Sequence, residues 1–180
     1  MEQGIRIAFG MKIFDNGFSL VELLIVVAII LILVAIAIPD LMRSRSAANQ
    51  SSAVGSLRLI ITSEVSYSAT FTAGFTSTLA ELDGNADPAT SLAAGLIDNV
   101  LGSGVKSGYT FYYVPCVTPG VPNSGSLAPG DCNGPIDVYQ VSANPNGGAG
   151  YGNFYYVDNS GVIRQNSKSP AGPSDPPIAG

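Results

Sequence analysis

The sequence predicts an α+β fold in which one long N-terminal helix packs on a small antiparallel β-sheet. Two observations predict the helix: an apolar run at 18–38 and an amphipathic pattern that continues to about residue 69. Short aromatic and β-branched runs after residue 71, separated by turn residues, predict the sheet. The 180 residues therefore divide into a leader at 1–17, an apolar half-helix at 18–38, an amphipathic half-helix at 39–70, a globular part at 71–166 and a Pro-rich C-terminal tail at 167–180.

The apolar run Phe18–Ile38 contains 21 residues, of which only Ser19 and Glu22 are polar. At about 1.5 Å per residue, a helix of this length spans roughly 30 Å, the thickness of a bilayer core. Its Ile and Val content would favour a strand in water, but a single segment in lipid must satisfy its own backbone hydrogen bonds and is therefore helical. A removed secretory signal peptide is disfavoured, because the run is too long and no A-x-A cleavage site ends it.

The predicted helix continues in amphipathic form after Pro39. The apolar side chains that recur there at steps of three and four, and that should share one face, are Val54, Leu57, Ile61 and Val65. Arg58 and Glu64 lie off this stripe. Pro39 is expected to bend the helix, because proline removes a backbone donor and crowds the preceding turn.

The globular part contains four runs that predict strands, at Tyr109–Val114, Val138–Ala143, Phe154–Val157 and Val162–Arg164. Asp158–Gly161 is a favourable turn between the last two runs. Ser91–Leu101 predicts a short helix that Gly95 weakens. The tyrosines within the strands are expected to pack rather than to bind, because sheets favour aromatic residues. The tail at 167–180 is expected to be either disordered or a surface strap.

Composition excludes several classes of function. The chain has no His and two Cys, so His-dependent nucleophiles, His-ligated zinc and Cys₄ metal sites are excluded. Its net charge of −5 argues against a nucleic-acid site, which needs a basic face. It contains neither a D-x-D-x-D-G calcium loop nor a G-x-x-x-x-G-K-[ST] phosphate loop. We therefore expect a structural or binding protein that uses no metal or cofactor and is not an enzyme.

Glu22 is the exception within the apolar run. A carboxylate inside a spanning helix costs about 2–3 kcal/mol or more, so such a residue is a functional candidate. Because Glu22 stands near the start of the run, it could instead reach the membrane surface.

The residues Gly17-Phe18-Ser19-Leu20-Val21-Glu22 resemble the N-terminal signature of type IV prepilins and the related type II secretion pseudopilins. The matching features are a short hydrophilic leader that ends in Gly, an aromatic residue after it, Glu at the fifth position after the Gly, and the long apolar run. The resemblance implies a pilin fold, peptidase cleavage between Gly17 and Phe18, and N-methylation of Phe18. It also implies that Glu22 meets the Phe18 amine of a neighbouring subunit and sets the register of assembly. Met11 is an alternative start for a shorter leader.

Cys116 and Cys132 enclose 15 residues that include three Pro and three Gly. A disulfide across this stretch would stabilise the fold by roughly 3 kcal/mol in the chain-entropy model, and it implies an oxidising compartment. A structural disulfide is favoured over two free thiols, and no C-x-x-C spacing supports a redox role. Pilins often pin a C-terminal loop in this way, whereas major pseudopilins often do not, so the pair favours a pilin.

The resemblance implies a structural subunit of a type IV pilus. Such a subunit is held in the bacterial inner membrane as a single-pass protein with a periplasmic globular domain, and is then polymerised into an extracellular helical filament. The implied partners are further copies of the chain, membrane lipid before assembly, the prepilin peptidase and methylase, the inner-membrane assembly platform and the assembly ATPase. A type II secretion pseudopilin is the alternative within the family. A membrane-anchored binding or enzymatic domain that never polymerises is the alternative from another class.

Overall fold

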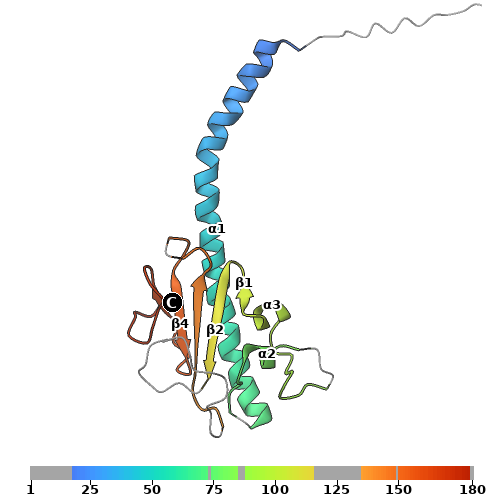
Figure 1. The fold of residues 1–180 in the computed structure, drawn as a ribbon, viewed down its shortest axis with the longest axis vertical. Coiled ribbons are helices and arrows are strands. Elements are labelled where there is room, and N and C mark those ends of the chain that lie inside the picture. Colours follow the sequence, from blue (N-terminus) through green and yellow to red (C-terminus); the bar gives the residue numbers. More distant parts are fainter. Residues whose placement is uncertain (1–17, 73, 85–87, 116–134, 149, 179–180) are drawn as a thin grey trace, which may run out of the picture. The chain divides into compact units, whose positions relative to one another are not determined.

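The computed structural model describes residues 18–72, 74–84, 88–115, 135–148 and 150–178. The chain divides between Met42 and Arg43 into two compact units. The elements drawn in Figure 1 are α1 (Leu20–Phe71), α2 (Leu79–Leu82), α3 (Asn99–Gly102), β1 (Val105–Lys106), β2 (Tyr109–Pro115), β3 (Tyr139–Pro145), β4 (Phe154–Asp158) and β5 (Arg164–Asn166). The predicted α+β fold, a long helix followed by a small antiparallel sheet, is confirmed.

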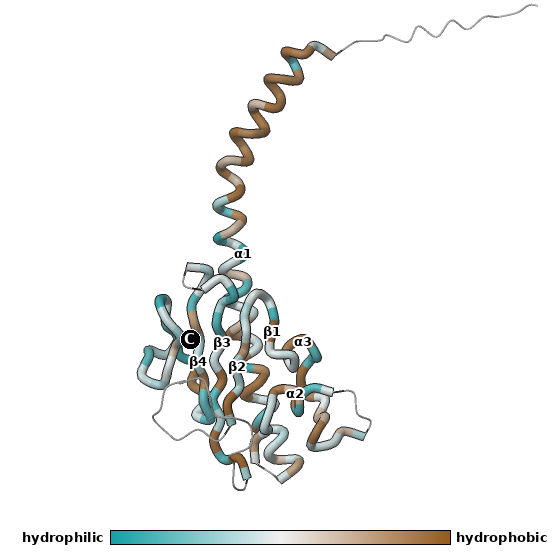
Figure 2. Tube along the Cα trace, viewed as in Figure 1, coloured by the Kyte–Doolittle hydropathy of each residue, from teal (hydrophilic) through white to brown (hydrophobic). Residues whose placement is uncertain are grey.

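Helix α1 covers 52 residues and confirms the long helix expected at about 18–69. No glycine occurs between residues 18 and 54, so nothing in that stretch offers the backbone freedom that weakens a helix. Pro39 lies inside α1 and does not end it. The bend at Pro39 stays a prediction. In Figure 2 the first part of α1 is hydrophobic on nearly every residue, which distinguishes it from the mixed colouring of the second unit.

The buried face of the second half of α1 differs from the predicted stripe. Residues buried on that face recur at steps of four and three, and they include Ala53, Leu57, Ile60, Glu64 and Tyr67. Leu57 was predicted correctly, but Val65 is 58% exposed, and Val54 and Ile61 are half-buried. The predicted stripe was wrong in part because it left out Glu64, which is buried, and the stripe was therefore displaced around the helix.

The sheet is antiparallel throughout, and its strands follow one another in the order β1-β2-β3-β4-β5. Across the centre, Phe111 pairs with Ala143, and Ala143 pairs with Tyr155. These three residues belong to one core cluster that also contains the buried apolar residues of α1. Because side chains alternate between the faces of a sheet, Phe154 and Tyr156 lie on the opposite face, where they form a second cluster with Ala171.

The strand tyrosines mostly pack, as predicted. Tyr109, Tyr139, Tyr155 and Tyr156 are each at most 4% exposed, whereas Tyr112 is 52% exposed. Burial raises the pKa of Tyr156 to about 12, so its hydroxyl stays protonated at neutral pH.

Three of the predicted strands lie where expected, and the last begins two residues later, at Arg164. The turn at Asp158–Gly161 is confirmed by a hydrogen bond of 2.9 Å from the Gly161 amide to the Asp158 carbonyl. The helix predicted at Ser91–Leu101 was wrong for most of its length, since α3 begins only at Asn99. Gly95 has a φ of +67°, which breaks a helix. The Ala94 and Leu96 amides instead donate to carbonyls of α2.

The described part of the tail is an ordered strap, which confirms one of its two predicted alternatives. We call residues 167–178 the strap. Backbone hydrogen bonds join Gln165 to Pro176 and Ile178 to Ile163, so the strap runs along the edge of β5.

Candidate functional site

The apolar half of α1 is exposed along its whole length in the isolated chain. Every described residue from 18 to 42 is exposed. The large apolar side chains of 18–38 range from 41% exposed at Val34 to 78% at Leu20. By length and composition α1 can cross a membrane. An apolar surface of this extent is stable only when lipid or other protein covers it.

Phe18 and Glu22 lie together at the start of this surface. Phe18 lies two residues before the start of α1 at Leu20, and Glu22 is the acidic residue of its first turn. A carboxylate at this place is favourable, because the N-terminal turn of a helix carries a partial positive charge. Gly17, Cys116 and Cys132 lie outside the described residues, so the cleavage site and the disulfide stay predictions.

A second polar site, which sequence reasoning missed, lies at the end of α1 in the globular unit. Glu64 is completely buried. Its carboxylate accepts hydrogen bonds from the Thr76 amide at 3.0 Å and from the Thr76 hydroxyl at 2.6 Å. The Tyr113 hydroxyl of β2 donates to the Thr76 carbonyl at 2.9 Å. These bonds tie α1, the segment that follows it and the sheet to one another.

Burial controls the electrostatics of this cluster. Desolvation raises the pKa of Glu64 above its ordinary value, although the two bonds from Thr76 act in the opposite direction. Burial together with the nearby Glu64 charge also raises the pKa of Tyr113 and of Tyr139, so both hydroxyls remain neutral. The negative charge of Glu81 also raises the pKa of Glu64.

The chain reaches Thr76 through a position that only glycine fits. Gly74 has a φ of +85°, and a Cβ atom built on it would lie 2.5 Å from the Ile136 carbonyl oxygen. The Phe75 amide donates to the same carbonyl at 2.8 Å. This close backbone approach leads the chain back toward the buried Glu64.

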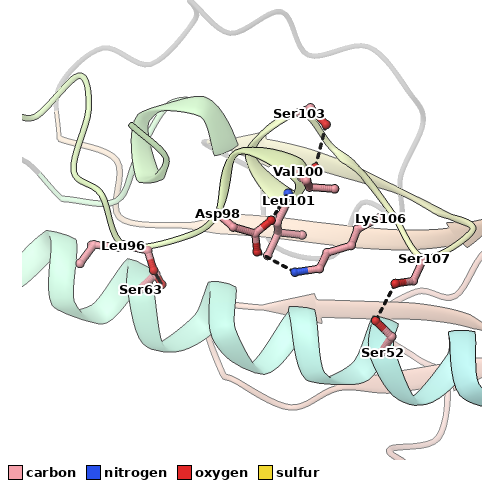
Figure 3. Close-up of polar contacts among 9 residues, drawn as sticks. All are labelled: Ser52, Ser63, Leu96, Asp98, Val100, Leu101, Ser103, Lys106 and Ser107. Carbon is pink, nitrogen blue, oxygen red and sulfur yellow. Dashed lines mark hydrogen bonds and ion pairs between the residues drawn. The ribbon is translucent and has the colours of Figure 1, made fainter. Parts of the chain in front are cut away.

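Polar contacts also hold the segment between α2 and β2 against α1, as Figure 3 shows. The Ser63 hydroxyl donates to the Leu96 carbonyl at 3.3 Å, and the Ser52 hydroxyl donates to that of Ser107 at 2.8 Å. The Lys106 ammonium lies 2.6 Å from the Asp98 carboxylate, and its hydrogen bond lowers the pKa of Asp98. Both side chains are partly exposed, so this pair contributes little to stability.

The described residues offer no arrangement for catalysis with a metal, since no group of three or more His, Cys, Asp and Glu side chains among them could hold an ion. The buried Glu64 and Thr76 instead bond to each other and join α1 to the segment that follows it. Glu64 could have been found from the sequence by its spacing, because it completes the steps Leu57, Ile60, Glu64 and Tyr67 on one helix face.

Comparison with known proteins bears on the site at the start of α1, where Phe18 and Glu22 lie. Residues 15–38 match the family described as the prokaryotic N-terminal methylation motif, the hallmark of type IV pilins and pseudopilins. The match contains Gly17, Phe18 and Glu22. No curated protein and no solved structure matches the chain.

The motif supports a prepilin of the type IV pilin or pseudopilin type, and the fold is a pilin-like α+β architecture. The motif implies processing by a prepilin peptidase and use of an assembly machinery in general. The exposed apolar helix is consistent with a membrane-anchored protein.

Proposed function

We propose that this chain is the structural subunit of a type IV pilus and has no enzymatic role. The observation that carries the proposal is that the methylation motif at 15–38 coincides with the first half of α1, whose large apolar side chains are all exposed. A subunit stored in the membrane and later assembled needs one surface that lipid and protein can cover in turn.

Assembly is then a transfer of the apolar half-helix between two apolar surroundings. In the inner membrane, lipid covers residues 18–38. In the filament, the same residues of neighbouring copies cover one another, while the globular units form the outer shell. Repeated head-to-tail contacts of this kind produce open helical assemblies. An assembly platform and an assembly ATPase supply the machinery, and we expect no direct nucleic-acid site on the chain.

Cleavage after Gly17 would create a charged amine on Phe18, and Glu22 would be its partner. Either charge alone is costly in an apolar core, whereas the pair offsets much of that cost. A slip of one helical turn between subunits would separate both charges from their partners. The pair therefore sets the register of neighbouring subunits in the filament. A contact within one subunit is the competing explanation, because residues four apart share a helix face.

Electron microscopy of filaments sheared from the cell surface, followed by mass spectrometry, tests the proposal. We expect filaments that yield peptides of this chain beginning at an N-methylated Phe18. A processed chain without surface filaments would identify a secretion pseudopilin instead. A monodisperse membrane monomer whose mass does not depend on the peptidase would identify an anchored binding domain and overturn the proposal.

A further inference from the structure

The outer edge of β5, the side away from β4, is a place where this sheet could pair with another chain. An edge strand presents unpaired backbone donors and acceptors, and these are a template for a further strand. Here the Gln165 amide donates to the Pro176 carbonyl at 3.0 Å, and the Ile178 amide donates to the Ile163 carbonyl at 3.0 Å. Arg164 and Pro177 are antiparallel bridge partners between these two bonds. Residues 176–178 therefore occupy the edge as a short additional strand.

The strap is anchored on both faces of the sheet. Ala171 is 2% exposed and packs with Phe154 and Tyr156 on the face away from α1. Ile178 packs against the core cluster on the other face, beside Val54 of α1. The strap thus passes around the edge of the sheet and is fixed by an apolar contact on either side of it.

Asp175 fixes the turn of the strap at the edge itself. Its carboxylate accepts hydrogen bonds from the Asn166 side-chain amide at 3.0 Å and from the Gly172 backbone amide at 2.8 Å. The Arg164 guanidinium donates to the Asp175 carbonyl at 2.9 Å. Two residues of β5 therefore hold the strap through polar bonds in addition to the backbone pairing.

The outer side of the strap is a poor template for any further strand. In an antiparallel strand the backbone groups of successive residues point alternately to the two sides. The Pro176 carbonyl and the Ile178 amide point toward β5, so the backbone groups of Pro177 point away from it. Proline has no N–H, and the strap therefore lacks a donor at its central outward position.

We propose that the strap is an intramolecular edge cap that acts in two ways. Residues 176–178 prevent β5 of one copy from pairing with β5 of a second copy, and Pro177 prevents the outer side of the strap from pairing with a second copy in its place. Antiparallel pairing of two β5 strands about a two-fold axis would join two sheets into one, and residues 176–178 occupy the backbone groups that this pairing needs. The inference goes beyond the proposed function and does not depend on filament formation.

The first test removes the cap from the full chain by ending translation after Ser169. The protein is studied in detergent by sedimentation and by hydrogen exchange of the peptide that contains Gln165. We expect a shift from monomer to dimer at concentrations where the wild type is monomeric, with the β5 amides exchanging fast in dilute samples and slowly in concentrated ones. Fast exchange of β5 at every concentration, without a dimer, would show that the strap only stabilises the fold and would overturn the proposal.

A second variant decides the question if the shortened chain fails to fold. Pro177→Val keeps the strap in place and adds the missing outward N–H. We expect this variant to dimerise through the strap, with new protection of the residue 177 amide in concentrated samples. Pro170→Val is the matched control, because Pro170 is exposed and lies outside the pairing with β5. A Pro177→Val protein as monomeric as this control would overturn the proposal.

Discussion

The two halves of α1 differ completely in what covers them. In the first half all sides of the helix are apolar and exposed. In the second half one face is buried against the sheet, and the exposed side carries mostly polar and small residues together with Leu59 and Val65. A helix that is apolar on every side has no preferred face, so a single small sheet cannot cover it. The first half therefore needs lipid or other copies, whereas the second completes its packing within its own chain.

The two glutamates of α1, Glu22 and Glu64, show the same difference. Glu64 has its hydrogen-bond partners in its own globular unit. Glu22 is exposed, and none of the described residues donates a hydrogen bond to its carboxylate. A carboxylate in an apolar surrounding needs a partner, and we expect the Phe18 amine created by processing to supply it, in the same or a neighbouring subunit.

The largest expected effect is the loss of processing in Gly17→Val. A side chain at the residue before the cut should exclude the chain from the peptidase, so the leader should remain attached and no filament should form. Intact-mass measurement of the membrane fraction checks this, with Gly10→Val as a matched control elsewhere in the leader. A chain that still begins at Phe18 would contradict the prediction.

Glu22→Val should abolish or strongly reduce filament assembly while leaving membrane insertion and cleavage intact. The substitution makes the helix more apolar, so insertion is not weakened, but the Phe18 amine loses its partner. Filament yield after shearing, compared with the amount of mature chain in the membrane, separates the two effects. Wild-type filament yield would leave hydrophobic packing as the driver of assembly and remove Glu22 from the mechanism.

A matched pair of leucine substitutions sharpens the contrast between the two halves of α1. Leu57 is 0% exposed, and Leu57→Ala should lower the free energy of unfolding of the globular unit by about 2–5 kcal/mol. Leu24 is 62% exposed, and Leu24→Ala should leave that free energy unchanged. Denaturant unfolding in detergent, followed by tyrosine fluorescence, measures both. Equal destabilisation by the two variants would show that the two halves of α1 do not differ in their contribution to the stability of the globular unit.

Reduction of the predicted Cys116–Cys132 disulfide should lower the free energy of unfolding by roughly 3 kcal/mol, through the entropy gained by the unfolded chain. Unfolding with and without a reductant measures this effect. The double variant with Ser at both positions should not respond to the reductant. Labelling of both thiols in unreduced exported protein would show that the bond does not exist.

The smallest expected effect is a pH dependence that belongs to Glu64. Because burial raises its pKa in the folded state above the ordinary 4.5, folding favours the protonated form. Stability from this group is therefore highest at low pH and declines as the pH rises from about 4.5 to the raised pKa. Glu64→Gln removes this dependence, so the stability of the wild type relative to the variant should fall across that window. Parallel curves for the two proteins would contradict the prediction.

The sequence was sufficient for features whose physical cause is local. An unbroken apolar run without glycine specifies the first half of α1, and the motif around Glu22 lies within a few consecutive residues. Strands β2, β3 and β4 were predictable for the same reason, since aromatic and β-branched residues favour extended backbone wherever they gather. The turn at Asp158–Gly161 needs only its own residues.

The remaining features depend on which distant segments meet, and composition does not encode that. Glu64 has the spacing of the buried face, but its polar side chain argues against burial; it is buried because Thr76 and Tyr113 return to α1. Ser91–Leu101 has helical composition, but its backbone groups find partners on α2 instead. The strap has no apolar pattern at all, and it is ordered because the edge of β5 offers it backbone partners. Each of these outcomes depends on hydrogen-bonding groups far apart in the chain, whose pairing becomes favourable only after the helix and the sheet have packed together.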